Sequence, residues 1–211
     1  MRIRDLERFG KNYLLALLPG FRQHRDLLVR GSIGDVLLGV VFNRSQLLSD
    51  ATDVECIAMP VIVPEEDLIL SHSLHLSPST GRSWRIDEEP QSVAAQLANA
   101  IRTEGERFFE ERSTVRQQLA FYESNRLENS FNWNEMTFYL LARLERWVEA
   151  SARLDAMVRI VRGPDSYDYM QNRLPLAQEL SALFGDHGAV SARFDAIRQQ
   201  TLLNIGLAGA S

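Results

Sequence analysis

The hydrophobic pattern of the chain changes near residue 88. Before that point the apolar residues form short runs separated by segments rich in turn-forming residues. Such runs are typical of β-strands, and short connections favour antiparallel pairing. The strand candidates are residues 27–29, 36–42, 54–63, 68–76 and a short run near Trp84. After Pro90 apolar residues recur every three or four positions, as on one face of an α-helix. The pattern predicts an α+β fold with an N-terminal antiparallel sheet of four or five strands, flanked by helices.

The same helical spacing appears at the N-terminus, where residues 3–17 form a helix candidate that ends at Pro19. Towards the other end, a polar segment at residues 124–130 interrupts the helical pattern. Polar breaks of this kind are where domain boundaries fall. We therefore expect an α+β domain over residues 1–126 and an all-helical domain of helical hairpins over residues 127–211.

A heptapeptide is repeated in the last third of the chain. SARLDAM at residues 151–157 recurs as SARFDAI at residues 191–197, and both differences exchange one apolar residue for another. Each copy follows another segment of helical spacing, so we expect equivalent second-helix positions in two stacked hairpins. Each copy would also present two alanines one helical turn apart and allow a close helix contact there (Ala152 with Ala156, and Ala192 with Ala196).

Residues 142–150, with the sequence ARLERWVEA, resemble the turn region of a tetratricopeptide-like helical hairpin. The resemblance extends over roughly residues 132–207. The chain departs from this family where Glu145 replaces the usual glycine, and its repeat is longer than the usual ~34 residues. The resemblance implies a helical scaffold that contacts another protein or its own partner subunit. A plain helical bundle with two similar helices is the alternative.

Aromatic and arginine side chains gather in the predicted helical part. Most of the aromatic residues are expected in the core. Because aromatic residues and arginine are favoured at the centres of interfaces, some of them are candidates for a contact surface. The predicted interaction surface consists of Trp133, Tyr139, Arg143, Arg146, Trp147, Arg153 and Arg193.

The most suggestive residues for catalysis lie between residues 71 and 75. On a strand, His72 and His75 point to opposite faces and cannot hold one metal ion together, whereas Ser73 and His75 share a polar face. No nucleophile-elbow motif accompanies them. We expect a solvated strand face here. The alternative is a hydrolase that uses His75 or His24 with distant carboxylates.

Two acidic clusters occur in predicted turns and are expected to face solvent: Glu65, Glu66 and Asp67, and Asp87, Glu88 and Glu89. The histidine spacings predict no metal site, and no cofactor motif occurs. Cys56 is the only cysteine, so no intramolecular disulfide can form, and we expect a small core residue in a reducing compartment.

Charge and hydropathy narrow the classes of partner. The net charge of −5 gives no electrostatic reason to expect nucleic-acid binding, and no apolar run approaches the ~20 residues of a membrane span. Only one of the 23 basic residues is lysine, which fits a GC-rich bacterial genome. We expect a cytoplasmic protein that acts by protein–protein interaction or self-association, as an adaptor, immunity-like or other regulatory protein without an evident active site.

Overall fold

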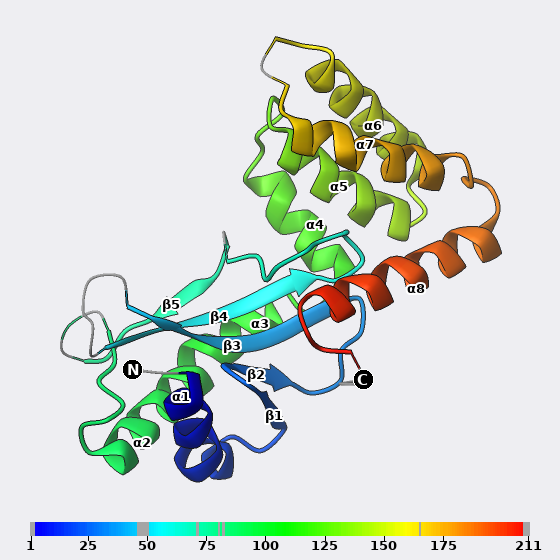
Figure 1. Ribbon diagram of the computed structural model, residues 1–211. Coiled ribbons are helices and arrows are strands. Elements are labelled where there is room, and N and C mark those ends of the chain that lie inside the picture. Colours follow the sequence, from blue (N-terminus) through cyan, green and yellow to red (C-terminus); the bar gives the residue numbers. More distant parts are fainter. Residues whose placement is uncertain are drawn as a thin grey trace. The chain divides into compact units, whose positions relative to one another are not determined.

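The computed structural model describes residues 3–45, 51–70, 72–79, 81, 83–164 and 166–208 (Figure 1). The described residues divide into two compact units, which are treated one at a time below. The sheet unit comprises residues 1–59, 67–113 and 207–211, and the helical unit comprises residues 60–66 and 114–206. The division into domains at residues 1–126 and 127–211 stays a prediction.

The sheet has five strands in the order β1-β2-β3-β4-β5, which confirms the predicted antiparallel sheet and the α+β class. The strands are β1 (Phe21–His24), β2 (Leu27–Arg30), β3 (Val36–Arg44), β4 (Thr52–Pro60) and β5 (Leu74–Leu76). Leu28 pairs with Val40 across β2 and β3, and Glu55 pairs with His75 across β4 and β5. Two details differ from expectation. Strand β1 was not predicted, and the candidate strand over residues 68–76 is reduced to three residues.

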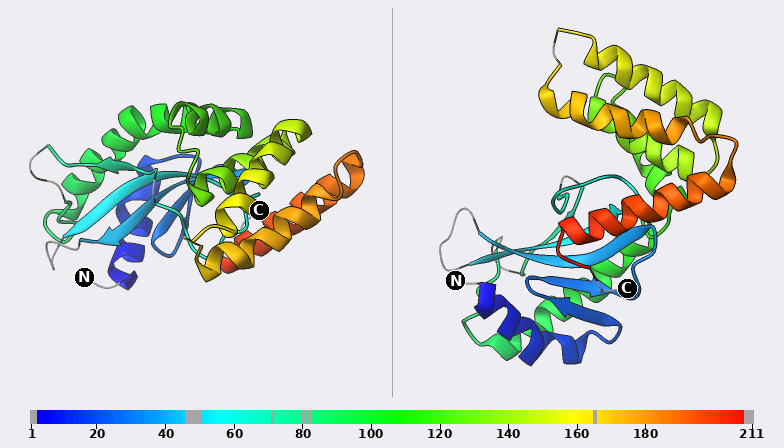
Figure 2. Two further views of the ribbon diagram at one scale, coloured as in Figure 1. Left: turned by 90° about the horizontal axis from the view of Figure 1, so that it is seen from above. Right: turned by 45° about the vertical axis from the view of Figure 1, so that its right-hand side comes forward.

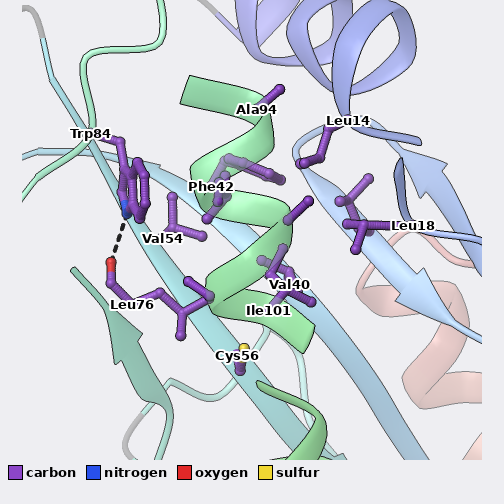
Figure 3. Packing of buried hydrophobic residues seen from close by; sticks show 14 of the residues in the cluster. Leu14, Leu18, Val40, Phe42, Val54, Cys56, Leu76, Trp84, Ala94 and Ile101 are labelled. Atoms are coloured by element: carbon purple, nitrogen blue, oxygen red, sulfur yellow. Dashed lines mark hydrogen bonds between the residues drawn. The ribbon is translucent and has the colours of Figure 1, made fainter. Parts of the chain in front are cut away.

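Helical segments cover one face of the sheet. They are α1 (Ile3–Phe9), the π-helix η1 (Gly10–Leu14), the 3₁₀ turn η2 (Leu15–Leu17), α2 (Pro90–Ala100), the π-helix η3 (Ile101–Gly105) and α3 (Glu106–Glu110). The predicted helix over residues 3–17 is therefore built from three successive helical geometries. Ile101 is fully buried in one core with Val40 and Val54 (Figure 3). Leu97 belongs to the same core. Burial of these apolar side chains on both layers holds the helices against the sheet.

Two contacts fix the fine packing of this core. The indole nitrogen of Trp84 donates a hydrogen bond to the carbonyl oxygen of Leu76 at 2.7 Å (Figure 3). Gly105 lets the helical layer approach β4 closely, because a Cβ at this position would lie 3.0 Å from the sulfur of Cys56. Burial raises the pKa of the Cys56 thiol far above its ordinary value, so the thiol stays protonated. Cys56 is the small core residue that the sequence predicted.

The helical unit contains α4 (Val115–Ser124), α5 (Phe131–Arg143), α6 (Trp147–Val161), α7 (Asp168–Ser181) and α8 (His187–Asn204). No described residue after Ser130 lies in a strand, as expected. Helix starts are capped by Thr114, whose side chain forms a capping box with Gln117, and by Ser130 and Asp186. Helix α5 is buried over most of its length and is contacted by the other four helices. It is the central helix of this unit.

The repeated heptapeptides occupy equivalent places, since Ser151 and Ser191 are each the fifth residue of their helix, α6 and α8. Helices α5 and α6 pack along their length as a hairpin, whereas α7 and α8 diverge after their turn (Figures 1 and 2). The expected alanine contacts are wrong. Ala152, Ala192 and Ala196 are exposed and Ala156 is half-buried. The larger side chains Met157, Phe194 and Ile197 are buried in their place, because they gain more from leaving water.

None of the described helices combines the length and the hydropathy that crossing a bilayer requires. The resemblance to tetratricopeptide-like hairpins stays a prediction.

Candidate interaction surface

The aromatic members of the predicted surface are divided between the core and the periphery of the helical unit. Trp133 and Tyr139 are buried in α5. The indole nitrogen of Trp133 donates to the carbonyl oxygen of Tyr122 at 2.8 Å and thereby ties α5 to α4. Buried side chains offer no contact area to a partner, so these two residues stabilise the unit instead. A helical spacing alone could not separate them from exposed aromatic residues.

Three of the predicted arginines make contacts inside the unit. The guanidinium carbon of Arg153 lies 4.6 Å from the centroid of the Trp133 ring, and that of Arg143 lies 5.6 Å from the Phe194 ring. Arg193 donates to a carboxylate oxygen of Glu179 at 2.6 Å. Cations over aromatic faces are attracted by the ring quadrupole. These half-buried arginines therefore link α6 to α5, α5 to α8 and α8 to α7.

Arg146 is the exposed member of the predicted set. Its Nε donates to a carboxylate oxygen of Glu149 at 2.7 Å, and its Nη2 lies 3.8 Å from a carboxylate oxygen of Glu123. The hydrogen bond from Arg146 lowers the pKa of Glu149 below its ordinary value. Exposed ion pairs of this kind contribute little to stability. Arg146 is accessible, but two carboxylates already neutralise it.

Trp147 is half-buried at the turn between α5 and α6. Its ring stacks on Phe184 with a centroid distance of 6.0 Å and also contacts His187 at 4.9 Å. His187 Nδ1 lies 2.9 Å from a carboxylate oxygen of Glu145, whose backbone is left-handed with φ 61°. The two helical turns are thus joined by ring stacking and by one hydrogen bond.

A buried ion cluster joins α5, α7 and the segment Pro60–Glu66. Arg173 Nε donates to Glu135 Oε1 at 2.7 Å, and Arg173 Nη2 donates to Glu65 Oε1 at 2.9 Å. The side chain of Glu135 is only 6% exposed. Burial raises the pKa of both glutamates, against the opposing effect of Arg173. Glu65 was expected to face solvent, and this expectation is wrong because Arg173 draws it into the unit. Glu66, Asp67 and the acidic cluster at residues 87–89 are exposed as expected.

The ion cluster has further polar contacts at its edge. Thr201 Oγ1 donates to the carbonyl oxygen of Val63 at 3.1 Å, and Asn204 Nδ2 donates to that of Glu65 at 2.9 Å. The hydroxyl of Tyr139 is buried without a hydrogen-bond partner in the described part of the chain, and burial raises its pKa. Acid–base catalysis needs a carboxylate that a substrate can reach. Glu135, at 6% exposure, is the least accessible carboxylate of the cluster, and the cluster ties α5 and α7 to the segment Pro60–Glu66.

The catalytic candidates of the sequence lie at the β4–β5 edge of the sheet unit. Glu55 faces His75 across the two strands, and the single hydroxyl hydrogen of Ser73 is shared between the Glu55 carboxylate and the carbonyl oxygen of Leu70. Ser73 and His75 are therefore near neighbours on one face, as the alternation of strand residues predicted. In a catalytic triad the hydroxyl hydrogen goes to an imidazole, which a carboxylate orients. Here the Glu55 carboxylate accepts the hydroxyl hydrogen directly, so the imidazole does not stand between hydroxyl and carboxylate as it does in a triad.

In the part of the chain that the structure describes, the remaining titratable groups form no evident metal centre. No cluster of three or more histidine, cysteine, aspartate or glutamate side chains suited to a metal ion occurs among the described residues. His72 lies in an exposed turn, and the partial desolvation of its ring, followed by the charge of Arg112, lowers its pKa. The hydrolase alternative stays a prediction.

The structure reveals an exposed pair of tyrosines that the sequence reasoning missed. Tyr167 and Tyr169, at the start of α7, are 61% and 47% exposed. Their rings stack with a centroid distance of 6.3 Å and an interplanar angle of 17°. Tyr169 also meets the buried ring of Phe131 edge to face at 6.0 Å, and its hydroxyl donates to Asn132 Oδ1 at 3.3 Å. Tyr169 therefore packs against α5, and Tyr167 stacks on Tyr169. We refer to Tyr167 and Tyr169 as the tyrosine pair.

One feature of the sequence could have indicated the tyrosine pair: a tyrosine stands at the helix start, where a capping residue is usual. Tyr167 is the residue before α7, where serine, threonine, aspartate or asparagine normally cap the helix, and its side chain makes no capping bond. Met170 is the buried residue of this turn, which leaves both tyrosines off the apolar face. Two large rings that serve neither the cap nor the core are candidates for contact with a partner. None of the protein families, curated proteins or solved structures with which the chain was compared matches it.

Proposed function

We propose that the chain is a protein-binding protein whose helical unit contacts a partner through the tyrosine pair. The observation that carries this proposal is the exposure of two stacked aromatic rings on a supported helix start. Tyrosine supplies a large contact area at a small cost in side-chain entropy, and it is enriched at the energetic centres of interfaces. The edge-to-face contact with Phe131 and the hydrogen bond to Asn132 restrict the ring of Tyr169 before any partner arrives.

The rest of the helical unit supports a scaffold role. The ion cluster of Glu65, Arg173 and Glu135 fixes α7 against α5, and the tyrosine pair begins the same helix α7. A rigid support lowers the entropy that binding must overcome. The chemistry at Ser73 and Glu55 offers no comparable support for an enzyme.

Site-specific photocrosslinking tests the proposal. A benzophenone amino acid is placed at position 167 or 169 in the full chain, and at the exposed Gln178 of the same helix as a control. After irradiation in the native cell we expect a discrete protein adduct from positions 167 and 169 that is absent from position 178. Mass spectrometry then identifies it as another protein or a second copy of this chain. The same diffuse adducts from all three positions would contradict the proposal.

A further inference from the structure

Resting on this proposed function, we infer that the tyrosine pair and Asp168 bind an arginine side chain presented by a cationic segment of the partner protein. The partner's guanidinium would lie over a tyrosine ring and pair with the Asp168 carboxylate. The inference concerns the chemistry of the partner, which exposure of the tyrosines alone leaves open.

Asp168 lies between the two tyrosines and is exposed. It is the first residue of α7, where a carboxylate favours the helix dipole. Within the described part of the chain its carboxylate makes no ion pair or hydrogen bond. A tyrosine face attracts cations within ~6 Å of its centroid. Three consecutive residues at one helix start therefore offer two exposed rings and an uncompensated carboxylate, and each attracts a cation.

The sheet unit contains the same three groups in a completed form. Arg30 donates to both carboxylate oxygens of Glu106, at 3.1 and 2.6 Å, and its guanidinium carbon lies 5.6 Å from the centroid of Phe109. A ring, a carboxylate and an arginine are thus a stable combination within this chain. At the tyrosine pair the described residues supply the rings and the carboxylate but no arginine.

The charges of the ion cluster also favour a basic partner. The ion cluster places two carboxylates, Glu65 and Glu135, on the single guanidinium of Arg173. Burial and then the Glu135 charge raise the pKa of Tyr169, and the positive charge of Arg173 opposes this rise. A negative surrounding opposes an acidic partner and favours a basic one. Arginine fits better than lysine because its planar group can stack on a ring while two N–H groups meet a carboxylate.

The test measures the binding of three synthetic Gly-Ser peptides to the full chain by fluorescence anisotropy. The peptides carry three arginines, three lysines or three glutamates at the same positions. We expect the arginine peptide to bind about fivefold more tightly than the lysine peptide, and the glutamate peptide not to bind. Tyr167→Leu with Tyr169→Leu, and separately Asp168→Asn, should each weaken the arginine peptide about fivefold or more. Val148→Ser, at a residue 86% exposed on α6, is the control and should leave binding unchanged.

Urea midpoints of all variants must match that of the native chain, which separates lost binding from lost folding. The inference would be overturned if the three peptides bound equally or if none bound. It would also be overturned if Asp168→Asn and the tyrosine variants left binding unchanged. If the peptides fail while crosslinks from positions 167 and 169 persist, the inference about arginine falls and the proposed function stands. If the crosslinks fail as well, both fall.

Discussion

Arg173 of α7 donates a hydrogen bond to Glu135 of α5 inside the helical unit, with an Nε–Oε1 distance of 2.7 Å. The same guanidinium also binds Glu65, so one cation compensates two carboxylates that are largely withdrawn from water. A buried ion pair adds little over a well-packed apolar replacement, but removal of one partner leaves the other charge uncompensated. The consequences of changing each member of the cluster are therefore unequal.

Replacing Arg173 with methionine should lower the free energy of unfolding by about 3 kcal/mol, because Glu135 and Glu65 are then left buried without a cation. Urea denaturation measures the loss. Adding Glu135→Gln and Glu65→Gln to the same chain should recover at least half of it. Arg126→Met is the matched control, since Arg126 pairs with Glu128 on the surface and its loss should cost under about 1 kcal/mol. Equal losses for the two single variants would contradict the structural role of the cluster.

The same carboxylates predict a pH dependence of stability. Burial raises the pKa of Glu135 above the ~4.3 of an unfolded glutamate. Between these two pKa values the folded state holds more protons than the unfolded chain, so the contribution of Glu135 to stability falls as the pH rises. Urea denaturation across this window should show that the free energy of unfolding of the native chain, minus that of Glu135→Gln, falls as the pH rises.

Glu149 supplies a control of opposite sign. The hydrogen bond from Arg146 lowers the pKa of Glu149, so its contribution is present above the ordinary pKa of glutamate and lost as the pH falls. The free energy of unfolding of the native chain, minus that of Glu149→Gln, should therefore rise as the pH rises. A Glu135 contribution that grew in the same way would show that this carboxylate is not destabilised by burial.

The strands that the sequence located well are those with strong local patterns. The apolar runs at residues 36–42 and 54–63 became β3 and β4, whereas β1 carries one apolar residue in four and gave no signal. The ion cluster could not be predicted from local sequence patterns, because Glu65 and Arg173 are 108 residues apart in the chain. The tyrosine pair was missed for a related reason. Residues two apart do not share a helix face, and the rings stack only because Tyr167 precedes the helix.

The repeated heptapeptide shows how a pattern can locate a helix and still misplace its buried face. Phe194 and Ile197 belong to a stripe of buried residues that begins at Val190 and reaches Thr201 and Leu202, while Ala196 faces solvent. Large apolar side chains gain more from burial than alanine does. The face with the large apolar side chains is buried, and the face with the alanines is exposed.

This correction yields a prediction on a single helix. Phe194→Ala should cost about 3–5 kcal/mol, since the ring is 1% exposed and its removal leaves a cavity. Ala196→Leu, two residues further on, should change stability by no more than about 0.5 kcal/mol because the site faces solvent. Both values come from urea denaturation of the full chain. A large loss of stability in Ala196→Leu would instead support the close alanine contact that the sequence suggested.

The last prediction concerns the sheet, where Gly39 of β3 lies opposite Val29 of β2. A Cβ at position 39 would lie 2.7 Å from the backbone oxygen of Leu28 and 2.8 Å from Leu27 Cδ1. The backbone oxygen belongs to a paired strand and cannot turn aside as a flexible side chain would. Gly39→Ala should therefore cost roughly 1–3 kcal/mol by overpacking.

Gly34 is the matched control, because a Cβ there would meet no atom within 4 Å and its backbone is not left-handed. Gly34→Ala should hold stability or raise it by about 0.4–1 kcal/mol, since alanine restricts the unfolded chain. Hydrogen exchange adds a local readout. In Gly39→Ala the amides of β2 and β3 should exchange faster than those of β4, because the strain falls on the β2–β3 pair. Unchanged stability and unchanged exchange in Gly39→Ala would contradict this prediction. They would mean that a Cβ at position 39 lies further from the Leu28 oxygen than 2.7 Å.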